Sequence, residues 1–130
     1  MRFSRKTTLS VSTVIVAIAA VTAGGDAALA GEADIIAVEA TALGDEQWRV
    51  SATVAHADTG WEHYADRFDV LAPDGTVLGE RVLLHPHVEE QPFTRSVTVT
   101  IPADITTITV RAHDSQHGLG GAELTIDLER

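Results

Sequence analysis

Hydrophobic and polar residues alternate along much of the chain beyond residue 45. Apolar side chains occupy positions 48, 50, 52 and 54, and polar side chains lie between them. The same period of two returns over residues 97–101, 108–112 and 124–128. A period of two turns one face of a strand toward a core and the other toward solvent. The pattern therefore predicts β-strands, and residues 97–128 leave no room for a helix of useful length.

Three weaker strands are predicted over residues 34–40, 64–71 and 76–84. The segments between strands carry residues typical of turns, and Pro73-Asp74-Gly75 is a strong hairpin signal between two apolar runs. Seven short strands in about 100 residues predict an all-β fold, a seven-stranded antiparallel sandwich of the immunoglobulin or fibronectin-III type. A small barrel is the alternative.

The first thirty residues follow a different pattern. Basic residues open the segment, an apolar run fills positions 9–21, and Ala28-Leu29-Ala30 ends it. This order predicts a secretory signal peptide that is cleaved after Ala30, because the apolar run is short for a membrane span. The chain then divides into a signal peptide (1–30) and a β-sandwich domain (31–130) that is periplasmic or secreted. A retained N-terminal anchor is the alternative.

Composition narrows the chemistry open to this domain. The 130 residues contain 9 Lys and Arg, 19 Asp and Glu and no Cys, which gives a formal net charge of −10. Without Cys there are no disulfides, thiolate nucleophiles, zinc fingers or Cys-ligated iron–sulfur centres. The predicted signal peptide holds three basic residues and one acidic residue, so the mature domain has a net charge of −12. Such an acidic domain is not expected to bind nucleic acid, which needs a basic surface.

The histidines fall in pairs into alternate connections between the predicted strands. In a sandwich whose strands reverse direction one after another, alternate connections gather at the same end. We therefore expect all six imidazoles at one pole and the Pro73-Asp74-Gly75 hairpin at the other. In chain order the pairs are His56 and His63, His85 and His87, and His113 and His117.

The local spacing of these residues suits metal ligation. His85 and His87 form an H-x-H unit, whose side chains project to the same side of an extended segment, and this pair is expected to contribute most. Asp114 would bind the metal directly or orient an imidazole. Imidazole and carboxylate without sulfur favour a divalent transition metal, with copper or zinc as the cofactor. The predicted metal ligands are His56, His63, His85, His87, His113, His117 and Asp114.

Three segments resemble those of small, largely uncharacterised exported bacterial β-sandwich proteins: GWEHYAD at 60–66, HPHVEEQPFTR at 85–95 and AHDSQHG at 112–118. This resemblance implies an exported sandwich and no particular activity. The His-Pro and His-Gly pairs at positions 85 and 117 are also similar to segments of superoxide reductases, which are immunoglobulin-like and hold iron through four His and one Cys. This chain has no Cys, so it departs from that family at the thiolate ligand.

Together these features predict a cell-envelope protein that binds a divalent transition metal and is not an enzyme. Its partners would be the metal ion and a further envelope protein, and exposed edge strands leave a homodimer open. An enzyme or a calcium protein has less support, because the sequence has no H-E-x-x-H motif and no D-x-D-x-D-G loop. The main alternative is a protein- or carbohydrate-interaction module without metal. Its contact residues would be Trp61, Tyr64, Phe93 and Arg95.

Overall fold

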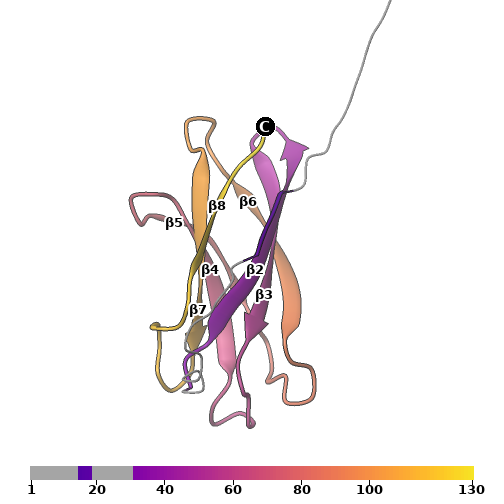
Figure 1. The fold of residues 1–130 in the computed structure, drawn as a ribbon, viewed down its shortest axis with the longest axis vertical. Coiled ribbons are helices and arrows are strands. Elements are labelled where there is room, and N and C mark those ends of the chain that lie inside the picture. Colours follow the sequence, from indigo (N-terminus) through magenta and orange to yellow (C-terminus); the bar gives the residue numbers. More distant parts are fainter. Residues whose placement is uncertain (1–14, 19–30) are drawn as a thin grey trace, which may run out of the picture.

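The computed structural model of the chain describes residues 15–18 and 31–130, which form two antiparallel β-sheets packed face to face (Figure 1). One sheet has the strand order β1-β2-β3-β6 and the other has the order β5-β4-β7-β8. The strands are β1 (Ile15–Ile18), β2 (Asp34–Gly44), β3 (Gln47–Ala55), β4 (Ala65–Leu71), β5 (Val77–Val82), β6 (Phe93–Thr100), β7 (Thr107–Asp114) and β8 (Leu124–Asp127).

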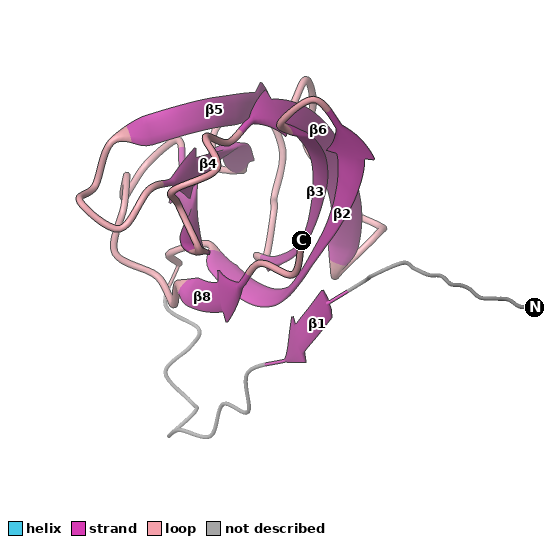
Figure 2. Cartoon of the chain, turned by 90° about the horizontal axis from the view of Figure 1, so that it is seen from above, coloured by secondary structure: helices cyan, strands magenta, loops and turns pink. Residues whose placement is uncertain are grey.

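The fold confirms the predicted all-β sandwich. Strands β2 to β8 correspond one to one to the seven strands expected from the alternation, and every pairing between neighbours is antiparallel. Seen from the end, the two sheets curve around a common interior (Figure 2). No ladder joins the two sheets among the described strands, so the fold is a sandwich and not the alternative barrel.

The core lies between the sheets and comes from the apolar half of each alternating strand. In β3 and β7 every second side chain is buried, as the period of two requires. Complete burial of one large apolar side chain stabilises a fold by about 1.5–3 kcal/mol. The largest fully buried apolar side chains are Trp48, Phe68, Phe93, Ile35, Ile101 and Ile108.

The connections alternate between the two ends of the sandwich (Figure 1). Backbone and side-chain hydrogen bonds join the β3–β4 connection to the β5–β6 connection through Asp58 and His87, and to the β7–β8 connection through Tyr64 and Ser115. These three connections therefore share one end, as the positions of the histidines suggest. We call this end, formed by residues 56–64, 83–92 and 115–123, the histidine pole. The Pro73-Asp74-Gly75 hairpin lies toward the other end.

The predicted signal peptide is described only at Ile15–Ile18, which pair as β1 with residues Ala37–Ala40 of β2. Residues 1–14 and 19–30, including the predicted cleavage position, lie outside the described residues. Cleavage after Ala30 therefore stays a prediction. Across the described ranges we find no helix long and apolar enough to cross a membrane.

Candidate metal centre

Asp114 is the last residue of β7, and its carboxylate is buried at the end of the core that lies next to the histidine pole. The period of two that buries Ile108, Val110 and Ala112 also turns Asp114 inward, and its side chain is fully buried. A tight turn follows, in which Asp114 and Gly118 exchange backbone hydrogen bonds and Gly118 adopts a φ of +71°. Asp114 Oδ1 accepts hydrogen bonds of 2.6 Å from the backbone N–H groups of Gln116 and His117. One carboxylate oxygen is thus occupied by the turn itself.

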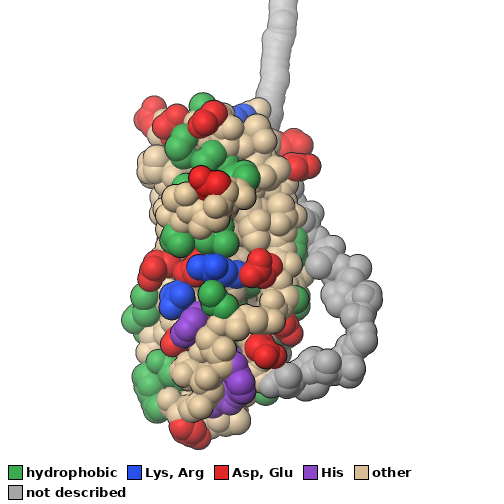
Figure 3. All heavy atoms as spheres, turned by 90° about the vertical axis from the view of Figure 1, so that its left-hand side faces the viewer, with side chains coloured by type: hydrophobic (Ala, Val, Ile, Leu, Met, Phe, Trp, Pro, Cys, Tyr) green, Lys and Arg blue, Asp and Glu red, His purple; other side chains and the backbone are tan. Residues whose placement is uncertain are grey.

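The other oxygen, Asp114 Oδ2, is surrounded by three imidazole nitrogens. His56 Nε2 lies 3.2 Å away, His63 Nε2 3.3 Å and His117 Nδ1 3.2 Å. His56 and His63 come from the β3–β4 connection and His117 from the β7–β8 connection, so the group forms only when these two connections pack together. We call these four residues the Asp114 cluster. Figure 3 shows imidazole side chains at the surface near this end of the molecule.

The positions of three members of the Asp114 cluster, His56, His63 and Asp114, fit a site that could hold one ion. Charge-assisted N–H···O⁻ hydrogen bonds are usually about 2.7–2.9 Å long, shorter than these contacts. Two ligand atoms bound to one ion at about 2.0–2.2 Å lie about 3–3.5 Å apart. The ring centres of His63 and its two neighbours, His56 and His117, are 4.8 and 4.9 Å apart. Ligand atoms of His56, His63 and Asp114 all lie within 4.8 Å of one another, which makes these three the tightest set.

The pKa of Asp114 keeps the carboxylate ionised. Burial alone would raise this pKa, but hydrogen bonds from the backbone of His117 and Gln116, and from the side chains of His117 and His63, lower it to about 2. A metal ion binds the deprotonated form of a carboxyl group. Asp114 is therefore in its ligating form across the physiological pH range.

Asp58 fixes the orientation of His56 from the opposite side of the ring. Its Oδ1 lies 2.5 Å from His56 Nδ1, and its Oδ2 accepts a hydrogen bond of 2.6 Å from the backbone N–H of His87. Both side chains are fully buried. With Nδ1 held by a carboxylate, Nε2 is the nitrogen that faces Asp114, an arrangement typical of metal-ligating histidines. Asp58 was not among the predicted metal ligands. In the structure its backbone N–H donates a hydrogen bond of 2.9 Å to the His56 carbonyl oxygen, and this tight turn brings the two side chains together.

The structure does not bring the other three predicted histidines to the Asp114 cluster. His113 faces outward from β7, and its Nδ1 lies 2.6 Å from Asp66 Oδ1. His85 is exposed, with its ring centre 4.7 Å from that of His87. The two residues of the H-x-H unit do lie together, but His87 stacks on Phe93 at 3.9 Å instead of facing Asp114. The pair expected to contribute most is thus outside the cluster.

His87 is a buried imidazole without hydrogen bonds. It is 5% exposed, and neither ring nitrogen has a hydrogen-bond partner among the described residues, although Asp58 Oδ2 lies 4.0 Å from Nδ1. Burial, together with the charges of Arg95 and His85, lowers the pKa of His87, while Glu90 and Asp58 act in the opposite direction. The neutral ring therefore contributes stacking on Phe93, and its backbone N–H holds Asp58 in place.

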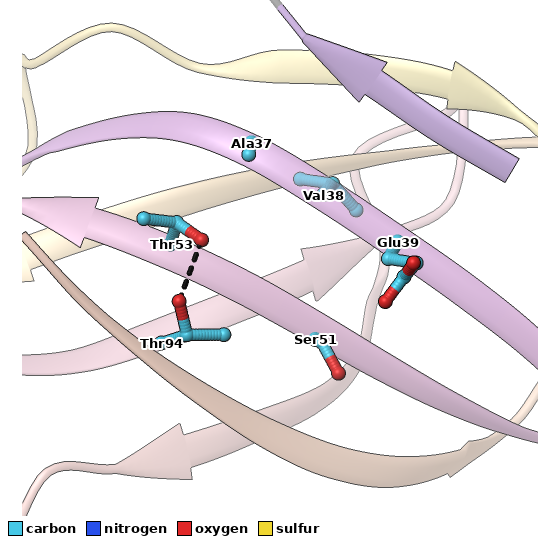
Figure 4. Close-up of a pocket in the computed structure, with 6 residues that line it drawn as sticks. All are labelled: Ala37, Val38, Glu39, Ser51, Thr53 and Thr94. Carbon is cyan, nitrogen blue, oxygen red and sulfur yellow. Dashed lines mark hydrogen bonds between the residues drawn. The ribbon is translucent and has the colours of Figure 1, made fainter.

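A hollow of about 250 Å³ lies elsewhere, on the sheet that contains β2, β3 and β6 (Figure 4). The hydroxyl groups of Thr53 and Thr94 in its wall bond to each other at 2.7 Å, and Glu39 is its one ionisable residue. It contains no member of the Asp114 cluster. Its lining residues are Ala37, Val38, Glu39, Ser51, Thr53 and Thr94.

The chain is similar in sequence to a protein described as a lipoprotein and in fold to a solved superoxide reductase. A protein described as a putative lipoprotein from Halomicrobium mukohataei is 40% identical over 98 residues, which cover 75% of this chain and 48% of that protein. The chain thus spans about half the length of the curated relative it matches. The solved structure of a superoxide reductase (neelaredoxin) from Ignicoccus hospitalis has a TM-score of 0.54 and 15% identity, covering 81% of this chain and 87% of that one. At this identity the likeness shows the fold alone. No protein-family model matches the chain.

Proposed function

We propose that this protein is exported to the cell envelope and binds a divalent transition metal ion through the Asp114 cluster. His56 Nε2, His63 Nε2 and Asp114 Oδ2 would be the principal ligands, and His117 the fourth. One observation carries the proposal: three imidazole nitrogens lie 3.2–3.3 Å from a single buried carboxylate oxygen. Nitrogen and oxygen ligands without sulfur suit Zn²⁺ and Cu²⁺.

The exposure of the cluster supports binding of an ion from solution. His56 and Asp114 are fully buried, whereas the side chains of His63 and His117 are 22% and 45% exposed. The cluster is thus buried on its inner side and open to solvent on its outer side. A metal site needs such an entry path.

Export is supported by the first thirty residues and by the description of the Halomicrobium relative as a putative lipoprotein. We place the processed protein in the periplasm or outside the cell, and residues 1–130 contain no Cys to which a thiol-linked lipid could be attached. The segment HPHVEEQPFTR at 85–95 resembles a segment of the small exported sandwich proteins, and this resemblance also supports export.

Binding is proposed in preference to catalysis. The superoxide reductase shares the fold at 15% identity, and this chain offers no thiolate. A site of three buried or half-buried ligands and one more exposed imidazole suits capture and release of an ion in trafficking, storage or sensing.

The proposal is tested by titrating the purified exported protein with Zn²⁺ and Cu²⁺ in a calorimeter at neutral pH. We expect one ion per chain, and loss of binding in the double variant His56→Ala/His63→Ala. His113→Ala is the matched control, because it removes an imidazole that lies next to Asp114 in the sequence but faces away from it. Absence of uptake of both ions, or equal uptake by the double variant and the wild type, would contradict the proposal.

Trp61 favours a second candidate function, the interaction module without metal. Its side chain is 66% exposed at the histidine pole and packs edge-on against Tyr64 at 5.5 Å. Exposed aromatic side chains are common contacts for proteins and carbohydrates. Under this alternative, Trp61→Ala abolishes partner binding, and a chelator leaves partner binding intact. Under the metal proposal, Trp61→Ala leaves metal uptake unchanged.

A further inference from the structure

Gly31 lies directly against the Asp114 cluster. Its carbonyl oxygen is 2.8 Å from His56 Nε2, the same nitrogen that faces Asp114. A Cβ added at this position would lie 2.6 Å from Cε1 of His117, and the φ of +126° is one that residues other than glycine rarely adopt. Position 31 is therefore restricted to glycine, which brings its backbone against two imidazoles of the cluster.

The backbone nitrogen of Gly31 must also lie near the Asp114 cluster, because it is close to the Gly31 carbonyl oxygen that contacts His56. Standard bond lengths keep the nitrogen of any residue about 2.7–3.6 Å from its own carbonyl oxygen, whatever the value of ψ. In the uncut chain this nitrogen belongs to the peptide bond with Ala30, where its lone pair is delocalised, so the neutral amide nitrogen is a poor metal ligand. Gly31 is also the residue that would become the N-terminus after the predicted cleavage.

Hydrolysis of the Ala30–Gly31 bond changes the chemistry of this nitrogen. The hydroxyl group of a water molecule goes to the Ala30 carbonyl carbon, and the proton goes to the Gly31 nitrogen. The products are a carboxyl group on the departing signal peptide and a primary amine on Gly31. The lone pair of this amine is available to a metal ion.

We propose that cleavage of the signal peptide completes the metal site, with the α-amine of Gly31 as an additional ligand. The amine and the Gly31 carbonyl oxygen would bind the same ion and close a five-membered chelate ring. This inference rests on the proposed function of the Asp114 cluster and deepens it. The uncut chain has the weaker ligand set, so tight binding begins only after export.

The completed ligand set also selects among metals. An amine adds a nitrogen donor to the imidazoles of His56 and His63, and a chelate ring strengthens binding further. For a given site with nitrogen and oxygen donors, affinity among divalent first-row ions is highest for Cu²⁺. We therefore expect the processed protein to prefer Cu²⁺ over Zn²⁺, and the N-terminal amine to account for much of that preference.

The chain allows a clean chemical test. Lys6 is its single Lys and lies in the predicted signal peptide, so the Gly31 α-amine is the single amino group of residues 31–130. The exported protein is purified, its N-terminus is determined by mass spectrometry, and half of the sample is acetylated. Hydroxylamine then removes acetyl groups from imidazole and phenol oxygen. Both samples are titrated with Cu²⁺ in competition with a chelator of known affinity.

We expect acetylation to weaken Cu²⁺ binding at least tenfold, and bound Cu²⁺ to protect the amine from acetylation. Equal affinity of the acetylated and free proteins would overturn this inference and leave the proposed function standing. An N-terminus other than Gly31 in the exported protein would also overturn it. Absence of binding in both samples would overturn the proposed function as well.

Discussion

Two buried carboxylates on neighbouring strands face different kinds of nitrogen group. Asp69 on β4 accepts hydrogen bonds of 2.9 Å from Nε of both Arg67 and Arg111. Asp114 on β7 faces three imidazole nitrogens at 3.2–3.3 Å. A guanidinium group is always charged and has no lone pair for a metal, whereas an imidazole can release its proton and bind one. Burial therefore leaves Asp69 paired with two permanent charges, whereas it leaves Asp114 among imidazoles that could hold a metal ion.

The largest expected effect is a difference in metal binding between two matched variants. Asp114→Asn removes the central carboxylate, and we expect Cu²⁺ and Zn²⁺ to bind about 100-fold more weakly or not at all, because changes even to residues that only orient a ligand weaken binding by about 10–100-fold. Asp69→Asn changes an equally buried carboxylate and should keep wild-type affinity. Calorimetric titration of both variants measures the difference.

The same pair of variants separates metal binding from folding. An ion at about 100 times its dissociation constant stabilises the folded state by about 2.7 kcal/mol. We expect this gain for the wild type and for Asp69→Asn, and none for Asp114→Asn, in urea unfolding with and without metal. Equal stabilisation of all three proteins would place the ion outside the Asp114 cluster.

A smaller effect is expected on the stability of the metal-free protein in acid, through the carboxyl group of Asp114. Its pKa of about 2 in the folded state lies below the ordinary value of 3.8. The folded state therefore gains stability that is fully present above pH 3.8 and is lost as the pH falls toward 2. The gain is on the order of 2 kcal/mol. Urea unfolding of the metal-free protein between pH 5 and pH 2 should show a steeper loss for the wild type than for Asp114→Asn. Parallel curves would show that the hydrogen bonds to Asp114 do not lower its pKa.

The smallest expected effect concerns His87, the imidazole without hydrogen bonds. Because burial lowers its pKa below 6.5, its contribution to stability is fully present above pH 6.5 and is lost as the pH falls through its folded value. Arg95 and His85 strengthen this shift, and Glu90 and Asp58 oppose it. We expect His87→Leu to be neutral or to stabilise by about 1 kcal/mol, since it removes two unpaired polar atoms. Chemical unfolding at pH 7.5 and 5.5 checks this, and a clear loss at pH 7.5 would contradict it.

The fold could be predicted because each strand carries its own evidence. Alternation in β3 and β7 follows directly from the need to bury one face, and antiparallel reversal then gathers the histidine-bearing connections at one end. Neither step requires knowledge of distant contacts. The sequence therefore predicted that the histidine-bearing connections share one end. Each of the seven strands of residues 31–130 overlaps a predicted range, although β6 begins at Phe93, four residues before the predicted start.

The composition of the site could not be predicted to the same degree. His113 and Asp114 are adjacent, and the period of two sends one side chain to the outer face and the other into the core. Both residues were predicted metal ligands. His85 and His87 lie side by side, as their spacing predicts. The direction in which the His87 ring points, however, is set by its stacking on Phe93, which belongs to a different element of the fold. Which imidazoles meet around one oxygen is decided by how separate connections pack, and sequence spacing contains no information on that.

The central claim is that His56, His63 and Asp114 hold one metal ion. The most direct test is a ¹H–¹⁵N spectrum of the imidazole nitrogens during titration with Zn²⁺, which is diamagnetic and leaves the resonances visible. We predict that Nε2 of His56 and of His63 shift together and reach their final positions at one equivalent, while His113 stays unchanged. Shifts confined to His85, His87 or His113, or no shift at one equivalent, would contradict the claim.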